Sequence, residues 1–291
     1  MELSESTKKT LLGFQRNELT EYSIYHNIAK RVRDEKDAAT LRAIGDEELR
    51  HSGIWKSYTG AEVRPKRLKI FWLTLLANVL GYTFALKLME GGEDAANGVY
   101  EKIAAEVPAA KKIAAEEDKH ERALLGILDE ERLQYVGSMV LGLNDALVEL
   151  TGTLAGLTLA LQNTKLIALS GLITGISATL SMASSEYLSA KAAGEKDAFK
   201  SATYTGIMYV IAVALMVLPY LLFPAEQYLA ALFTMLAIVV LVILVFNYYL
   251  SVAKDLDFKK RFFEMAGISL SVAALSFVIG LLAKQLLGID I

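Results

Sequence analysis

Two short units of the sequence, each a glutamate followed three residues later by a histidine, are the residues best suited to chemistry. They are Glu48 with His51 and Glu117 with His120. On a helix, residues three or four apart share one face, and in both units that face is otherwise apolar. A carboxylate buried without a partner is costly or is forced to stay protonated. These two helix faces therefore indicate a metal site.

Two further segments carry a single acidic residue in the same kind of apolar stripe. Glu18 lies in the stripe between Leu11 and Ala29, and Glu93 lies in the stripe between Leu86 and Ile103. Carboxylates from four helices with two imidazoles are the ligand set of di-iron and di-manganese bundles. We therefore expect a dinuclear metal centre rather than a salt-bridged core. Its expected ligands are Glu18, Glu48, His51, Glu93, Glu117 and His120.

Four helices are expected to position these ligands, as two similar pairs. Each pair offers a lone glutamate, a tyrosine seven residues later, and then a Glu-x-x-His unit. The tyrosines, Tyr25 and Tyr100, could hydrogen-bond the ligands or only pack in the core. His26 lies off the stripe and is expected at the surface or in a pair. The first helix is expected over about 4–32, and the second follows the charged turn 34–37 and ends near 58. The third is long and runs from the basic stretch 64–69 to near 107. The fourth has Pro108 in its first turn.

One uncharged segment could contradict a four-helix site. Ile70 to Leu86 has seventeen residues without charge, which is at the short end of what crosses a hydrocarbon core of about 30 Å. If it crossed, Glu93 and Glu117 would lie on the opposite side of the membrane from Glu18. We therefore expect this segment to begin the third helix, buried in the bundle, in a dimer contact or against the membrane surface.

The composition divides the chain into two parts. The chain has 291 residues, a net charge of -3 and no cysteine. Most charged residues lie in the first part, so we expect an all-α protein with a four-helix bundle at 1–134 and a five-helix transmembrane domain at 135–291. The balanced charge gives no sign of a nucleic-acid surface. Without cysteine, disulfides and thiolate metal sites are excluded. The polar N-terminus is not a secretory signal, so the bundle is expected in the cytoplasm.

Five apolar segments are expected to cross the membrane. They are about Val136–Leu161, Leu166–Ser189, Ala202–Phe223, Tyr228–Leu250 and Phe262–Leu287. The connections after the second and fourth spans hold most of the lysines and arginines of this part, whereas the other two hold only Lys165. Positive charge marks the cytoplasmic side. The bundle is therefore expected inside the cell and the C-terminus outside.

The first two spans carry acids that have no role in a plain anchor. Asp145 and Glu149 lie four residues apart on one helix face, which Gly152 and Gly156 continue. The second span repeats the spacing with Gly171, Gly175, Met182 and Glu186. Acids inside a spanning helix usually mark an ion or proton path, and the glycines should let the faces of these two spans approach each other closely. Carboxylates with a thioether suit Fe²⁺ better than Mg²⁺ or Ca²⁺. The alternatives are a structural hydrogen-bond cluster for the acids and simple packing for Met182.

The stretch from Gly142 to Gly156, followed by Ser181 to Ser189, resembles the first two spans of the vacuolar iron transporter family. The resemblance implies a dimeric five-span exporter of Fe²⁺, and often Mn²⁺, in exchange for protons. It also implies a metal path through Asp145, Glu149, Met182 and Glu186. One difference concerns the connection between the second and third spans. Eukaryotic members place a Glu-rich metal-binding segment there, whereas this chain has only Lys191 to Ser201.

The first part, about Glu5 to Glu131, resembles the ferritin-like fold of rubrerythrins without their rubredoxin domain. The resemblance implies the same six di-iron ligands, with Glu21 and Glu90 as possible alternates. Bacterial membrane-bound ferritins join these two modules in the same order.

Two functions follow from these patterns. The first is a transporter, in which the bundle captures or senses Fe²⁺ and the spans export it. The alternative is a membrane-anchored di-iron oxidase or peroxidase. Because Fe³⁺ hydrolyses and should not pass a Fe²⁺ path, full oxidation would compete with export. Capture or sensing is therefore expected ahead of oxidation.

Overall fold

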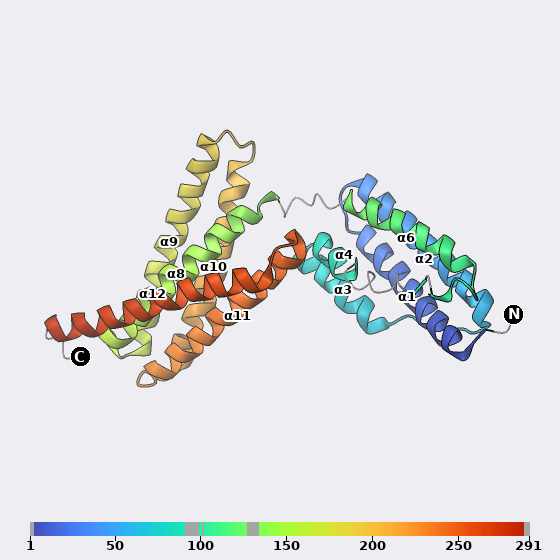
Figure 1. Cartoon of the computed structure of the whole chain (residues 1–291). Helices are drawn as coiled ribbons and strands as arrows, with labels where there is room; N and C mark the ends of the chain where they lie inside the picture. The colour runs from blue at the N-terminus through green and yellow to red at the C-terminus, as the bar shows by residue number, and fades with distance from the viewer. Residues whose placement is uncertain (1–2, 91–98, 101, 127–133, 288–291) are drawn as a thin grey trace. The chain divides into compact units, whose positions relative to one another are not determined.

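The computed structural model describes residues 3–90, 99–100, 102–126 and 134–287. In this described part every regular element is a helix, as the sequence predicts (Figure 1). The chain divides into two compact units, Met1–Glu131 and Arg132–Ile291.

A helical hairpin forms the centre of the first unit. Helix α1 spans Glu5–Ala29 and α2 spans Glu35–Thr59, and the two pack along each other. Ser4 and Asp34 begin these helices because their side chains accept hydrogen bonds from backbone N–H groups of the first turn. Gly60, at φ 64°, ends α2 in a left-handed conformation that glycine adopts readily. Helix α6, Ala109–Leu125, packs against α2.

The expectation of one long third helix is wrong, because this segment forms two separate helices. Helix α3 spans Arg67–Leu80 and α4 spans Tyr82–Glu90. Gly81 between them has φ 102° and ψ 152°, a backbone conformation essentially restricted to glycine. At 14 residues α3 reaches only about 21 Å, too short to cross a membrane. It packs instead on α1 and α4, within the first unit.

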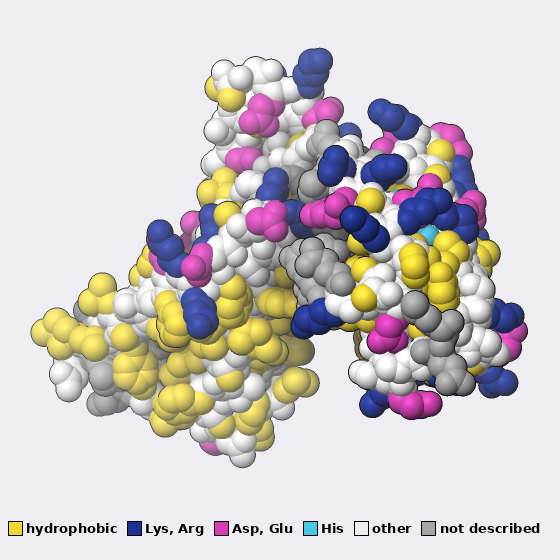
Figure 2. Space-filling view, turned by 45° about the vertical axis from the view of Figure 1, so that its right-hand side comes forward, with side chains coloured by type: hydrophobic (Ala, Val, Ile, Leu, Met, Phe, Trp, Pro, Cys, Tyr) yellow, Lys and Arg dark blue, Asp and Glu magenta, His cyan; other side chains and the backbone are white. Residues whose placement is uncertain are grey.

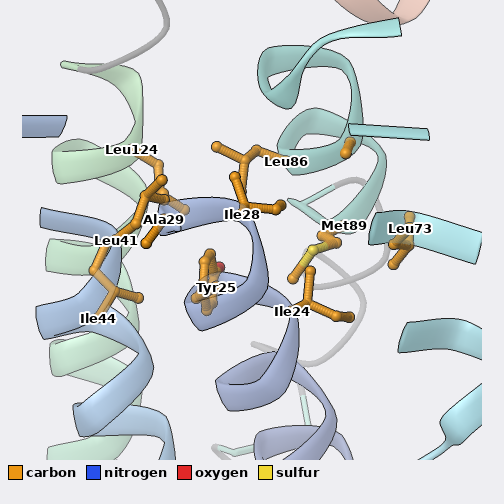
Figure 3. Packing of buried hydrophobic residues seen from close by; sticks show 11 residues of the cluster. Ile24, Tyr25, Ile28, Ala29, Leu41, Ile44, Leu73, Leu86, Met89 and Leu124 are labelled. Carbon is orange, nitrogen blue, oxygen red and sulfur yellow. The ribbon is translucent and has the colours of Figure 1, made fainter. Parts of the chain in front are cut away.

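Two apolar clusters fill the core of this unit. One gathers Ile24 and Ile28 of α1 with Leu73 of α3 and Leu86 of α4, as Figure 3 shows. The other gathers residues nearer the opposite ends of the helices, among them Leu11, Trp55 and Ile113. The polar residues expected to bind metal fall between the two clusters along α1, α2 and α6. A polar layer thus interrupts an otherwise apolar core.

The second unit consists of five helices that are long and apolar enough to cross a membrane. They are α8 Val136–Leu161, α9 Thr164–Ala192, α10 Ala198–Leu222, α11 Tyr228–Lys254 and α12 Phe258–Leu287. Helix α8 packs against all four of the others. On the face seen in Figure 2, hydrophobic side chains cover much of the surface of this unit. An apolar exterior of this kind is what a bilayer solvates.

The glycines of the first two spans approach other helices than the sequence suggested. Gly152 and Gly156 of α8 face Ser276 of α12, not α9. Gly175 of α9 faces Val213 of α10. Only Gly171 partly fits the expectation, because its neighbours are Leu154 of α8 and Val217 of α10. The periodicity identified the close-packing faces correctly, but not their partners.

Candidate metal sites

Four of the predicted ligands meet in the polar layer of the first unit. Glu18 from α1, Glu48 and His51 from α2, and Glu117 from α6 each offer a ligand atom within 4.8 Å of the others. His120 of α6 joins them, with Nδ1 at 3.0 Å from Oε1 of Glu48 and 3.3 Å from Oε2 of Glu117. The two imidazole rings stack, with centroids 5.7 Å apart. Glu93, the sixth predicted ligand, lies outside the described residues.

Three buried ligand atoms in this group have no hydrogen-bond partner. They are Oε2 of Glu48, Nδ1 of His51 and Oε1 of Glu117. The last two lie only 3.0 Å apart. A buried polar atom that makes no aligned hydrogen bond is expensive, so atoms this close that do not form one indicate a place where something else can bind. A cation between them would satisfy all three atoms, so the donor set and its geometry fit a metal.

The pKa values of Glu18 and Glu48 are shifted in opposite directions. Burial, together with a hydrogen bond and the negative charge of Glu48, raises the pKa of Glu18 well above its usual range. Burial also raises the pKa of Glu48, but hydrogen bonds with Glu18, His120 and His51 outweigh that and lower it to about 2. The environment thus favours the neutral form of Glu18 and the ionised form of Glu48.

Both histidines are protonated at neutral pH in the absence of metal. Burial lowers their pKa values, but the carboxylates of Glu117 and Glu48 overcome it. The pKa is about 9 for His51 and about 11 for His120. Protons therefore occupy this site when no cation does. A metal ion must displace them, because only neutral imidazole can coordinate.

A second layer of acids surrounds the histidines, and sequence reasoning did not identify it. Nε2 of His51 lies 3.0 Å from Glu116, which also pairs with Arg50 at 2.8 Å. Nε2 of His120 lies 2.9 Å from Glu47, whose side chain is 48% exposed. Partners of this kind orient a ligating imidazole and fix its tautomer. The signal was present in the sequence, because each Glu-x-x-His unit is preceded directly by another glutamate.

Aromatic residues cover one side of the layer. Trp55 donates from Nε1 to Oε1 of Glu18 at 3.1 Å. Tyr100 packs against Trp55 and Phe14, and burial with the nearby charge of Glu18 raises its pKa strongly. Tyr25 is buried in the core cluster. His26, the histidine off the stripe, pairs with Asp46 at 2.9 Å.

Glu21, one turn from Glu18, does not belong to the group of four ligands. It lies 3.3 Å from Nζ of Lys69. Burial raises the pKa of its carboxyl group to about 7, and Lys69 partly counters this rise. The side chain of Glu90, the other possible alternate ligand, lies outside the described part.

Glu149 and Glu186 of the membrane unit each have a hydrogen-bond partner, and the predicted acids of the spans do not form one shared cluster. Glu149 accepts from the hydroxyl of Tyr209 at 2.9 Å, and Glu186 accepts from Ser138 at 2.7 Å. Asp145 and Met182 are both partly buried. Among the described residues of the single chain, the only group of three or more acids and histidines with ligand atoms within 4.8 Å lies in the first unit.

The fold and sites define a class of protein. Five apolar helices make it a multi-pass membrane protein. Residues 136–196, which comprise α8, α9 and most of the connection to α10, match the VIT family. The match indicates that this part of the chain is a membrane transporter of iron or another divalent metal. No curated protein and no solved structure matches the chain.

Proposed function

We propose that the protein exports Fe²⁺, with Mn²⁺ as a second substrate, from the cytosol in exchange for protons, and that the first unit is a ferritin-like domain that captures or senses the metal. The observation that carries the proposal is the combination of two features in one chain. One is a buried cluster of carboxylates and imidazoles with unsatisfied donor atoms. The other is a membrane unit that matches a metal-transporter family.

Capture in the first unit is a competition between metal and protons. Glu48 and Glu117 offer orphaned oxygen atoms, and His51 offers an orphaned nitrogen atom. Oxygen and imidazole donors suit Fe²⁺ and Mn²⁺, and the chain has no thiolate that would favour Zn²⁺ or Cu⁺. Binding of the cation releases the protons from the histidines. The proposal adds Glu93 to complete a dinuclear ligand set.

Transport in the membrane unit would use the same exchange of metal for protons. Asp145 and Glu149 lie on one face of α8, and Met182 and Glu186 lie on one face of α9. Carboxylates in a spanning helix can hold a cation or a proton in turn. The hydroxyl groups of Tyr209 and Ser138 orient Glu149 and Glu186. Since one chain does not bring these acids into a single cluster, the proposal includes a homodimer that brings two copies of the path together.

The alternative function is a membrane-anchored di-iron oxidase or peroxidase. The buried ligand group in the first unit favours it, because a di-iron pair would supply the electrons for reduction of O₂ or peroxide. Trp55 and Tyr100 would then exclude water from one side of the pair. Export of Fe²⁺ and its oxidation use the same ion, so the two activities compete.

Flux through proteoliposomes separates the two functions. The parent, Asp145→Ala, Glu48→Ala and the control Glu226→Ala, in the exposed α10–α11 connection, are compared for Fe²⁺ and Mn²⁺ flux with and without a pH gradient. Transport predicts that Asp145→Ala abolishes flux, that Glu48→Ala weakens or deregulates it, and that Glu226→Ala behaves as the parent. The proposal fails if the parent moves no metal. If the parent moves no metal but consumes O₂ or peroxide in the presence of Fe²⁺, the oxidase or peroxidase function would be established instead.

A further inference from the structure

One face of α3 is apolar and exposed. Leu68, Phe71, Trp72, Leu75 and Val79 are between 38% and 70% exposed. Their spacing of three or four residues places them in one stripe along the helix. Five large apolar side chains on 14 residues are far more than scattered surface residues, and such patches mark interaction sites.

The opposite face holds α3 on the bundle. Leu73 is 6% exposed and belongs to the core cluster with Ile24 and Met89, as Figure 3 shows. Ile70, Leu76 and Ala77 pack against the same cluster. The helix is therefore fixed in place by one apolar face while it presents a second one outward.

Basic residues precede the exposed stripe. Arg64, Lys66 and Arg67 are exposed, and Lys69 is partly buried beside Glu21. The sequence has no acidic residue from Val63 to Met89. An apolar face with neighbouring cations matches the chemistry of an anionic lipid surface.

The length of the chain between α6 and the first span limits how far this end of the bundle can lie from the start of that span. Leu124, near the end of α6, packs in the same cluster as Leu73. The first span begins at Val136, ten residues after Gly126, so the chain between them can extend at most about 36 Å. A tether this short gives the bilayer a high effective concentration at the exposed stripe.

We propose that α3 is an interfacial helix that inserts its Leu68–Val79 stripe into the bilayer crossed by the five spans, with Arg64, Lys66 and Arg67 on anionic headgroups. A second copy of the chain is the competing occupant of the stripe. The lipid surface is favoured because the flanking charge is of one sign and the membrane is tethered nearby. The contact between Lys69 and Glu21 links this helix to α1, which carries Glu18.

Tryptophan fluorescence tests the insertion. The chain has two tryptophans, Trp55 with no exposed surface and Trp72 with 53% exposed. Full-length Trp55→Phe, which keeps Trp72, is reconstituted in liposomes with plain or chain-brominated lipids. The matched control is Trp72→Phe, which keeps Trp55. Insertion predicts loss of Trp72 emission in brominated lipid and little change for Trp55. Equal Trp72 emission in both lipids would overturn the proposal.

The charge dependence and the competing occupant need separate variants. In Trp55→Phe, replacing Arg64, Lys66 and Arg67 by Gln, or using neutral lipid, should reduce the quenching; quenching that stays the same contradicts the headgroup contact. The parent has no cysteine, so Val79→Cys forms an interchain disulfide only if two copies meet there. Lys36→Cys, exposed on α2, is the background control. Efficient cross-linking of Val79→Cys without quenching of Trp72 would assign the stripe to a second copy.

Discussion

At the residue scale, the ligand group of the first unit combines excess acid with protons that offset it. Glu18, Glu48 and Glu117 share a largely buried layer, and the two imidazolium groups provide the positive charge. The remaining orphaned atoms show that protons do not satisfy every lone pair. A divalent cation supplies the same charge from one point and can bind all of them. At high pH, where the imidazolium protons are lost, a divalent cation can therefore balance the charge of these buried acids in their place.

Glu48→Gln should remove most metal binding. Glu48 is the ionised carboxylate that touches both histidines, and an amide cannot supply its charge. We expect affinity for Mn²⁺ and Fe²⁺ to fall at least about tenfold. Glu121→Gln is the matched control, since Glu121 is exposed on α6 and lies outside the ligand group. Metal equivalents per chain are measured after anaerobic loading and desalting. Equal metal content in both variants would remove Glu48 from the site.

Metal binding should strengthen as the pH rises from 6 to 8. The pKa values of about 9 for His51 and about 11 for His120 lie above this range, so both protons must leave. Each displaced proton makes the apparent affinity rise about tenfold per pH unit. Calorimetry with Mn²⁺ in buffers of different ionisation enthalpy counts the protons released. A pH-independent affinity would mean that the histidines do not coordinate.

The raised histidine pKa values also predict that the stability of the metal-free fold falls as the pH rises, whereas the metal affinity increases. The pKa of His51 is raised from about 6.5 in the unfolded chain to about 9 in the fold. Its charge therefore stabilises the metal-free protein fully below pH 6.5, and this contribution is lost as the pH rises through about 9. Metal-loaded protein should lack this loss when the two forms are unfolded thermally side by side.

At the element scale, glycine positions decide which helices can touch. A Cβ at Gly142 of α8 would overlap the backbone carbonyl of Thr205 in α10. Gly142→Ala must push these two spans apart, with an expected cost of about 1–3 kcal/mol. Gly137→Ala in the same helix is the control, because nothing lies within 4 Å of a Cβ there. Size-exclusion chromatography after stepwise heating in detergent measures the difference. Equal midpoints would contradict the α8–α10 packing.

The sequence predicted most elements because their signals are local. Capping residues Ser4 and Asp34 mark the starts of α1 and α2, and the spans follow from long apolar runs. The break at Gly81 was missed, because a glycine inside an apolar run gives no sign of its backbone angles. The partners of Gly152 and Gly156 were also missed, since a helical period fixes a face but not the helix that covers it.

For the candidate metal site, the sequence predicted which side chains share a helix face but not which outer contacts they make. The spacing of Glu48 with His51 and of Glu117 with His120 placed these residues on common faces, and the structure brings them together with Glu18. The outer contacts of Glu47 and Glu116 depend on side-chain directions between helices. Such directions are tertiary information that helical spacing does not contain.

At the scale of the whole molecule, the absence of cysteine makes the proposed orientation simple to test. The α9–α10 connection, near Lys191, Lys196 and Lys200, is expected in the cytoplasm. Glu195→Cys there should react with a membrane-impermeant maleimide only after lysis, whereas Glu226→Cys in the α10–α11 connection should react in intact cells. The unsubstituted chain gives the zero background. The reverse labelling pattern would mean that the protein has the opposite orientation in the membrane, and the proposed transport would then be import rather than export.

The hydrogen bond from Trp55 to Glu18 has a practical consequence for the complete protein. Both tryptophans lie in the first unit, so tryptophan emission from the intact chain carries no signal from the spans. The Trp55 indole donates to Glu18, one of the proposed ligands, so metal binding should change its surroundings and its emission. Occupancy of the bundle can therefore be followed optically, without a dye, in the same vesicles in which flux is recorded, and the order of loading and passage can be timed directly.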